Sequence, residues 1–318
     1  MELIRGAHNL RPRHRGSVVT IGNFDGVHLG HQAVLGQLAE KGAELGLPTT
    51  VVSFEPLPRE YFTGGRAPPR LQRFRDKCLA LRRFSVDRLL CLRFNAALAR
   101  MCPEDFIRIL LVEQLGVRYL VVGDDFRFGR QRAGDFQTLK EAGKVHGFEV
   151  THMHTFPIDG ERVSSTRIRR ALTLGRMTEA EKLLGRRYRI SGRVVHGDKQ
   201  GKPLGFPTAN LLLGPSPMAI RGVHAVEVFG LPGEPLQGVA NAGTRPTLGG
   251  MQNRLEVHLF DFDGDLYGRH LQVDLLHHLR DEQRFPSLDA LRAQITLDAA
   301  QARQFFAAPT SSAPHGTD

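Results

Sequence analysis

Residues 17–31 read SVVTIGNFDGVHLGH, and this stretch sets the expected fold. It opens with an apolar run (17–21), continues as a glycine-rich turn, and is followed by an amphipathic segment over residues 32–45. This order predicts a strand, a tight turn and a helix. The N-terminus of a helix carries unpaired N–H groups and a partial positive charge, which favour a bound phosphate. The stretch therefore predicts a phosphate-binding turn.

Two histidines lie where the predicted helix begins. His28 and His31 are three residues apart, so they share one face of the first turn. Two imidazoles at this place can donate hydrogen bonds to a phosphoryl group as negative charge builds in a transition state. The alternative is an ordinary turn with surface histidines. Because both histidines occur within G-x-F-D-G-x-H-x-G-H, the sequence favours a nucleotide-handling loop.

Length and composition favour a soluble protein of two domains. The chain has 318 residues, of which 41% are hydrophobic and 24% are charged. No apolar run approaches the roughly 18 residues of a transmembrane helix, and the first residues lack the apolar core of a signal peptide. The three cysteines form no C-x-x-C pair, which argues against a disulfide framework or a zinc site. We therefore expect a cytoplasmic protein without a membrane partner.

The net charge of +10 has two explanations. It is compatible with a nucleic-acid-binding surface, and equally with an arginine-rich enzyme that uses polyphosphate substrates. The basic clusters at residues 11–15 and 186–189 contain no interleaved tryptophan or phenylalanine, and tryptophan is absent. The sequence therefore predicts no nucleic-acid partner.

Strand and helix patterns alternate up to about residue 185. The expected strands are 51–54, 88–92, 119–122 and 148–150, and the expected helices are 72–84, 103–115 and 135–145. Such alternation predicts a parallel sheet covered by helices, with ligands beyond the carboxyl ends of the strands. The glycine-bounded loop 123–129 then faces the same crevice as the histidine loop. A third segment, 164–170 (SSTRIRR), offers helix-capping serines and Arg169 as a phosphate clamp. Taken alone, segment 164–170 is better explained as a capped surface helix with solvated arginines than as a phosphate site.

The second half is rich in short strands. They are expected at 188–195, 209–213, 222–229, 238–241, 255–262 and 271–276, with a closing helix at 288–305. Their spacing predicts a small antiparallel β-barrel or β-sandwich. We therefore expect domains at residues 1–185 and 186–307, followed by a disordered tail at 308–318.

A second candidate site lies in this half, at residues 201–210 (GKPLGFPTAN). The spacing is not that of a Walker A loop. Thr208 and Asn210 would lie on one side of a strand, and their side-chain oxygens suit Mg²⁺. Judged by spacing alone, however, an ordinary turn in which both side chains bond to the backbone is the better explanation. Glu256 shares a strand face with His258 and Phe260. It is either a solvated carboxylate or, at a ligand mouth, a base for a substrate hydroxyl.

Together these motifs resemble the bacterial bifunctional riboflavin kinase/FMN adenylyltransferases, or FAD synthetases. The resemblance extends from about residue 17 to 303. The matching segments, in the family's order, are 22–31, 54–56, 123–129, 164–169, 201–210, 241–247, 256–262 and 279–282. Two positions depart from it: His224 replaces a more frequent tyrosine, and Leu57 replaces a frequent histidine.

The resemblance implies a Rossmann-like nucleotidyltransferase domain and a riboflavin kinase-like barrel. The kinase would convert riboflavin and ATP to FMN and ADP, and the adenylyltransferase would convert FMN and a second ATP to FAD and pyrophosphate. Mg²⁺ is expected in both halves, and the protein is expected to be a monomer or a weak homo-oligomer.

The family pattern also implies roles for individual residues. In the first half, ATP and phosphate binding fall to Gly22, Asn23, Phe24, Asp25, His28, His31, Asp125, Ser165, Thr166 and Arg169. In the second half, ATP and flavin binding fall to Gly201, Lys202, Gly205, Pro207, Thr208, Asn210, Arg280 and Glu282, with Thr208 and Asn210 as the metal ligands. His28 and His31 are expected to be catalytic, and Glu256 is expected to be the kinase base.

Two other functions remain open at this point. A different nucleotidyltransferase would explain residues 17–185, but not residues 201–210 together with Glu256. A basic RNA-associated binding protein predicts salt-sensitive RNA binding and no ATP turnover.

Overall fold

The computed structural model describes residues 1–64, 66–153, 157–196, 205–213, 217–247 and 250–308. Contacts divide the chain into two compact units, Met1–Arg167 and Ile168–Asp318. Gly201 and Lys202 lie outside the described residues, as does the tail from residue 309. The two units are described separately below.

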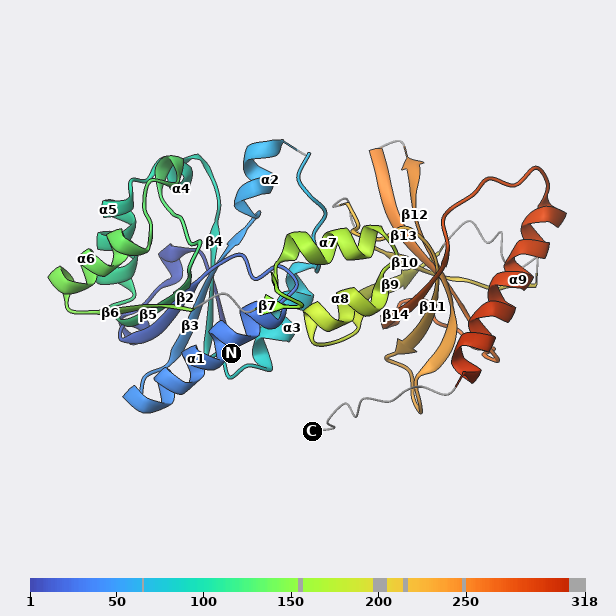
Figure 1. Cartoon of the computed structure of the whole chain (residues 1–318), viewed down its shortest axis with the longest axis horizontal. Helices are drawn as coiled ribbons and strands as arrows, with labels where there is room; N and C mark the ends of the chain where they lie inside the picture. Colours follow the sequence, from blue (N-terminus) through green and yellow to red (C-terminus); the bar gives the residue numbers. More distant parts are fainter. Residues whose placement is uncertain (65, 154–156, 197–204, 214–216, 248–249, 309–318) are drawn as a thin grey trace. The chain divides into compact units, whose positions relative to one another are not determined.

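The first unit is built on a six-stranded sheet in which all neighbours are parallel, in the order β1-β4-β3-β2-β5-β6 (Figure 1). The strands are β1 (Glu2–Arg5), β2 (Ser17–Ile21), β3 (Thr49–Glu55), β4 (Arg88–Arg93), β5 (Val117–Gly123) and β6 (Glu149–Met153). From β2 the chain moves outward through β3 and β4, whereas β5 and β6 lie on the other side. The strand order therefore reverses between β2 and β5, where open parallel sheets bind ligands. The predicted parallel sheet is confirmed, and β1 is an edge strand that the sequence did not reveal.

Helices cover both faces of this sheet. The helices are α1 (Leu29–Leu45), α2 (Pro58–Thr63), α3 (Phe74–Arg82), α4 (Ala96–Arg100), α5 (Pro103–Asp105), η3 (Phe106–Gln114) and α6 (Phe136–His146). Three short 3-10 turns, η1 (Ala7–Asn9), η2 (Pro12–His14) and η4 (Arg130–Arg132), and a hairpin of β7 (Pro157–Ile158) and β8 (Glu161–Arg162) complete the unit. Val18 and Val51 pack with α1 and α3, whereas their neighbours Val19 and Val52 pack with η3 and α6. Successive side chains thus point to opposite faces and are buried on both, and Figure 1 shows helices on the two sides of the sheet.

The helix predicted over residues 103–115 has an unusual second half. Pro103 occupies the first helical position, as expected. After one turn the helix continues as the π-helix η3, in which the Leu115 N–H donates to the carbonyl of Leu110, five residues earlier. Gly116, at φ 53°, ends it. The predicted helix is present, with a wider turn than its periodicity indicated.

The second unit contains a closed barrel in the order β10-β13-β12-β11-β14-β9, with every pair antiparallel. Its strands are β9 (Tyr188–Val195), β10 (Ala209–Leu212), β11 (Gly222–Phe229), β12 (Leu236–Thr247), β13 (Gly250–Leu259) and β14 (His270–Arg280). Leu255, Val257 and Leu259 are buried, whereas Glu256 and His258 between them are only partly buried. The predicted barrel and the alternation along β13 are confirmed.

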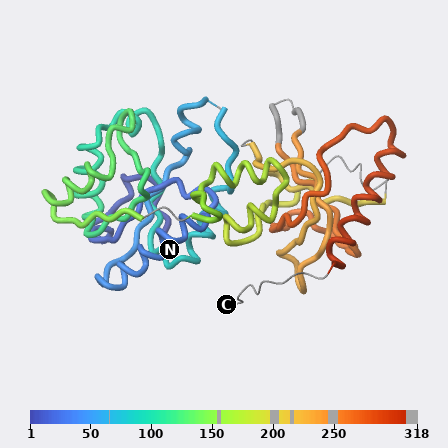
Figure 2. Tube along the Cα trace, viewed as in Figure 1, coloured from blue at the N-terminus to red at the C-terminus, as the bar shows by residue number. Residues whose placement is uncertain are grey.

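Three helices belong wholly or partly to this unit. They are α7 (Ser165–Thr173), α8 (Met177–Leu184) and α9 (Leu288–Ala307). Helix α9 runs along the outside of the barrel (Figure 2) and contacts β11, β12 and β14. Helix α8 packs on β9 and β14, so the second contact-defined unit includes α8 as well as the barrel. Within the described ranges, no helix is long and apolar enough to cross a membrane.

Candidate active sites

The histidine loop connects β2 to α1 at the switch point of the sheet. His28 is the N-cap of α1, and its Nδ1 accepts a hydrogen bond from the His31 backbone N–H at 3.3 Å. The two imidazoles stack, with ring centroids 3.7 Å apart and planes 16° apart. Because Nδ1 of His28 is an acceptor, a neutral His28 carries its proton on Nε2. The expected shared face of the two histidines is confirmed.

His31 is held in an environment that disfavours its charged form. Burial lowers its pKa well below the ordinary value, and the positive charges of His28, Lys77 and Arg162 lower it further. Its Nδ1 atom is shielded from solvent and has no hydrogen-bond partner among the described residues. His31 is therefore a neutral imidazole at pH 7, able to donate one N–H.

The loop backbone is strained. Phe24 and Val27 have φ values of 48° and 40°, in a region that residues other than glycine seldom adopt, and both side chains are almost fully buried. Gly26 between them has φ 92°. Strain of this kind persists only where surrounding contacts hold it, and it is concentrated at functional sites. The loop is thus fixed by its neighbours.

Asp25 supplies one of these contacts. Its buried carboxylate accepts backbone hydrogen bonds from Leu71 at 3.0 Å and from Gln72 at 3.3 Å. The carboxylate thus ties the histidine loop to the segment that precedes α3. Phosphate binding by Asp25 stays a prediction, and the structure gives its side chain a positioning role.

The serine-rich segment meets the histidine loop directly. Ser165 Oγ donates to the carbonyl of Asp25 at 2.9 Å, and Ser164 Oγ accepts from the Arg167 N–H at 3.2 Å. The structure thus brings together two segments 140 residues apart. Thr166 is exposed at the start of α7, while Arg169 lies beyond the contact boundary, in the second unit.

The loop after β5 is connected to the same region through Arg162. This arginine, on β8, donates to Asp125 at 2.7 Å and lies 3.7 Å from Asp124. Asp125 is exposed, and its carboxylate is occupied by this ion pair. The backbone carbonyl of Val163, the residue after Arg162, lies against Gly30 of the histidine loop, so the end of the hairpin, the loop after β5 and the histidine loop lie close together. The predicted meeting of these loops is confirmed, although the sequence did not single out Arg162.

A group of two exposed and two partly buried aromatic rings lies near the carboxyl ends of β3 and β4. Tyr61, Phe62 and Phe94 contact one another edge-on, with centroids 5.3–5.6 Å apart, and Phe54 packs against Phe94 at 5.9 Å. Phe62 is 67% exposed. Arg70, next to the segment held by Asp25, pairs with Glu55 and Glu60 of the same region. We call these four rings the aromatic patch.

The barrel places three oxygen-bearing side chains in one row across neighbouring strands. Glu256 on β13 pairs in register with Asn210 on β10 and with Asn241 on β12. Side chains of directly paired residues lie on the same face of a sheet. The Oδ1 atoms of both asparagines are buried without a hydrogen-bond partner among the described residues. Asn241 begins the family-like segment 241–247 but was not a predicted site residue; the strand register shows that it pairs with Glu256.

The oxygens of this row suit a hard divalent cation. Asn210 is 7% exposed, Thr208 is partly buried two residues earlier, and Mg²⁺ takes oxygen atoms as ligands while keeping several waters. Nearby, His258 Nδ1 donates to the carbonyl of Pro207 at 3.0 Å, and Gly205 adopts φ 86°. The residues that the structure describes contain no cluster of three His, Cys, Asp or Glu side chains arranged for a metal.

Arg280 is the last residue of β14, and Glu282 lies in the loop that follows. Arg280 makes a two-pronged ion pair with Asp298 of α9, with both contacts at 2.8 Å. Asp298 is 2% exposed. Glu282 is exposed, and its carboxylate occupies the space where a side chain at Gly243 would lie. Arg280 therefore fastens α9 to the barrel, and flavin contact by Arg280 and Glu282 stays a prediction.

We expect Asp298→Ala to lower the free energy of unfolding of the barrel unit by about 3 kcal/mol, because it leaves the Arg280 guanidinium without its partner. Thermal or urea unfolding would measure the change. Arg303→Ala is a matched control, since Arg303 pairs from the same helix with the exposed Asp261. It should leave Tm nearly unchanged. Equal effects of the two variants would contradict the expected role of the Arg280 pair.

The two departures from the family pattern have structural explanations. His224 is fully buried on β11, and burial lowers its pKa to about 4, while its Nε2 lies 3.0 Å from the carbonyl of Arg221. Leu57 is the buried N-cap residue of α2. Both are packing positions.

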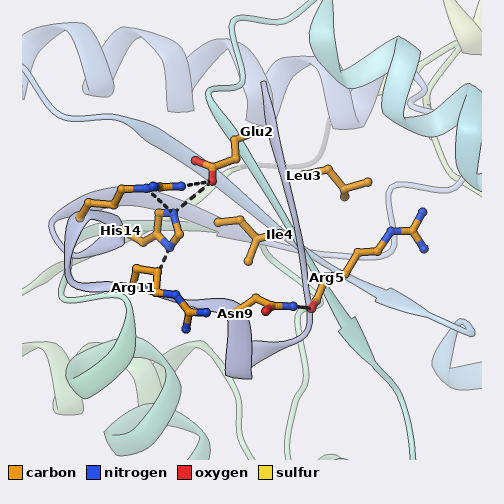
Figure 3. A pocket seen from close by; sticks show the side chains of 8 residues that line it. Glu2, Leu3, Ile4, Arg5, Asn9, Arg11 and His14 are labelled. Atoms are coloured by element: carbon orange, nitrogen blue, oxygen red, sulfur yellow. Dashed lines mark hydrogen bonds and ion pairs between the residues drawn. The ribbon is translucent and has the colours of Figure 1, made fainter.

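A pocket of about 380 Å³ lies at edge strand β1 (Figure 3), and its lining contains none of the predicted site residues. Glu2 accepts a hydrogen bond from Arg13 at 2.7 Å and lies 3.3 Å from the buried His14. Arg88 donates to the backbone carbonyls of Arg13 and His14. These contacts anchor the segment before β2 to the sheet edge, which indicates a structural role.

Comparisons with known proteins identify both units. A family model described as FAD synthetase matches residues 10–167, and one described as riboflavin kinase matches residues 184–306. The bifunctional riboflavin kinase/FMN adenylyltransferase of Escherichia coli K12 is 52% identical over 307 residues, covering 96% of this chain and 98% of the relative. That of Pseudomonas fluorescens is 51% identical, covering 98% and 99%.

This chain belongs to the bifunctional riboflavin kinase/FMN adenylyltransferase family. The predicted family and its two enzyme activities are thereby confirmed. We refer below to the adenylyltransferase unit and the riboflavin kinase unit.

A solved structure supports the fold over the same length. A crystal structure described as a macrolide-efflux protein from Streptococcus pneumoniae is 29% identical, with a TM-score of 0.80, and covers 95% of this chain and 99% of its own. The combination of folds in this enzyme is therefore shared with a solved protein.

Proposed function

We propose that this enzyme makes FAD in two steps at two separate sites. In the riboflavin kinase unit, the terminal hydroxyl of riboflavin takes the γ-phosphoryl group of ATP, giving FMN and ADP. In the adenylyltransferase unit, the FMN phosphate attacks the α-phosphorus of a second ATP, giving FAD and pyrophosphate. The row formed by Asn210, Glu256 and Asn241 supports the kinase assignment, because Glu256, the candidate base, pairs with two asparagines whose Oδ1 atoms have no hydrogen-bond partner among the described residues.

Adenylyl transfer requires positioning and electrostatic stabilisation rather than a protein nucleophile, since the FMN phosphate is itself an anion. We assign this task to His28, His31 and the N-terminus of α1. Both imidazoles can donate an N–H to phosphoryl oxygens, His28 through Nε2. The Ser165 contact and the Asp25 carboxylate hold the loop in place, and Arg169 is expected to bind phosphate.

The aromatic patch is the proposed contact surface for the flavin ring of FMN. A flat heteroaromatic ring is stabilised by stacking on or against exposed aromatic side chains. The patch is linked to the histidine loop through Asp25, which binds the Leu71 N–H, and through Arg70, which pairs with Glu55 and Glu60. This arrangement suits a substrate with an aromatic ring at one end and a phosphate at the other.

In the kinase step, Glu256 is the proposed general base. It accepts the proton of the riboflavin hydroxyl as that oxygen attacks the γ-phosphorus, and the ADP oxygen leaves. Thr208 and Asn210 would hold Mg²⁺, and the cation would neutralise charge on the ATP phosphates. Gly201, Lys202, Gly205 and Pro207 belong to the loop expected to cover the nucleotide.

Other properties follow the same proposal. We expect Mg²⁺ to be required in both halves, and we expect a cytoplasmic monomer or weak homo-oligomer without a nucleic-acid partner. The kinase domain is proposed to begin near residue 186, with α7 and α8 preceding it.

The first test is to incubate the purified protein with riboflavin, ATP and Mg²⁺ and to separate the flavins by chromatography. FMN followed by FAD is the expected result. FMN alone would mean that the first unit uses another acceptor, as the rival nucleotidyltransferase hypothesis holds. Salt-sensitive RNA binding without ATP turnover would instead support a binding protein.

A further inference from the structure

Lys77 is a buried cation that neither the sequence motifs nor the proposed chemistry uses. It lies on α3 and is 3% exposed. Its Nζ lies 3.1 Å from the carbonyl oxygen of Asn23 and 3.1 Å from Ser53 Oγ. Lysine is almost never fully buried without a partner, because removing an ammonium from water is costly. A buried lysine bound to a backbone carbonyl therefore calls for an explanation.

The first partner explains where Lys77 acts. Asn23 belongs to the histidine loop, next to the strained Phe24, while Ser53 lies on β3 of the sheet. The Lys77 ammonium thus connects the histidine loop to strand β3 of the sheet. Since Asp25 and Ser165 hold the same loop by other bonds, three independent contacts fix its backbone.

The charge of Lys77 also reaches the catalytic imidazoles. The charged groups acting on His31 are His28 on the loop, Lys77 on α3 and Arg162 on the hairpin, and all three disfavour a protonated His31. Burial lowers the pKa of Lys77, and the carboxylates of Glu55 and Asp25 oppose that shift. Lys77 is therefore close to two carboxylates, one of which, Asp25, belongs to the histidine loop itself.

We propose that Lys77 is a positioning residue of the adenylyltransferase: its buried ammonium holds the histidine loop against the sheet and places a positive charge beneath the phosphate site. The inference rests on the proposed function of that loop. It gives Lys77 two separable roles, as a hydrogen-bond donor to Asn23 and as a charge near His31.

Three variants separate these roles. Lys77→Met removes donor and charge, Lys77→Gln keeps a donor without the charge, and Lys77→Arg keeps both. We expect kcat for FAD formation from supplied FMN to fall about tenfold in Lys77→Met, because a small misplacement of catalytic groups is costly. The KM for ATP should change less, and Lys77→Arg should recover most of the rate.

The pH profile distinguishes positioning from a merely structural role. Removing the positive charge raises the pKa of His31, so the acidic limb of kcat should move to higher pH in Lys77→Met and Lys77→Gln, but not in Lys77→Arg. A lysine needed only for folding would lower the active fraction and leave the limb in place. If Lys77→Met does not fold, the Gln and Arg variants decide the question alone.

The same chain supplies the controls. Riboflavin phosphorylation by each variant should stay within about twofold of the wild type, since its site lies in the other unit, and Lys140→Met, at an exposed position on α6, should leave both reactions unchanged. The inference would be overturned if Lys77→Met kept the wild-type kcat and the wild-type acidic limb of the pH profile. It would also be overturned if the acidic limb of Lys77→Gln stayed at the wild-type pH. Failure of the wild type to form FAD would instead refute the proposed function.

Discussion

Glu256→Gln should abolish FMN formation, with the kinase rate falling about 10²–10⁴-fold. Glutamine keeps the size and polarity of the side chain but cannot accept the proton of the riboflavin hydroxyl. A primary alcohol is a poor nucleophile, so the reaction depends strongly on a base. Chromatography of flavins after incubation with riboflavin and ATP would measure the loss.

Two controls isolate the effect of Glu256. The variant should convert supplied FMN to FAD at the wild-type rate, because that reaction uses the other unit. Glu234→Gln, at an exposed position between β11 and β12, should leave FMN formation unchanged. An unchanged kinase rate in Glu256→Gln would remove Glu256 from the mechanism.

His28→Ala should have the reverse pattern: FAD formation falls about 10²–10³-fold while riboflavin phosphorylation continues. The substitution removes an N–H donor to the developing charge on the phosphoryl oxygens. It also removes the cap of α1, because the His28 side chain accepts the His31 N–H. Pyrophosphate release from FMN and ATP would measure the rate.

His28→Asn separates these two losses, since asparagine is a favoured N-cap residue. We expect it to retain the stability of the wild type but to lose nearly as much activity as the alanine variant. His146→Ala, at the exposed end of α6, is the matched control. Wild-type adenylylation in His28→Asn would show that the imidazole does no more than cap the helix.

The sequence was sufficient for the features that depend on local pattern. Strand, turn and helix around residues 17–45 follow from hydrophobic periodicity, and so does the alternation along β13 that sets Glu256 apart from Leu255. The pairing of His28 and His31 follows from helical spacing alone. These features required no knowledge of distant contacts.

Features that depend on tertiary contacts could not be found in this way. Lys77 lies within a predicted helix, where a lysine is normally solvated, and only packing against β3 reveals its burial. Asn241 became a site residue only through the register of β12 with β13. For Asp25, the motif indicated a ligand contact, whereas the fold shows a carboxylate bound to backbone N–H groups. The motif therefore indicated correctly where Asp25 lies, but not what its side chain does.

The presence of both units in one polypeptide has a consequence for the relative amounts of FMN and FAD that the enzyme produces. Translation of one message always yields equal numbers of the two kinds of site, whatever the level of expression. The steady ratio of FMN to FAD produced by this enzyme therefore cannot be adjusted by changing the relative abundance of the two activities. It depends on the turnover of each site and on its substrate supply, so it is set by the side chains on the histidine loop and on the barrel strands.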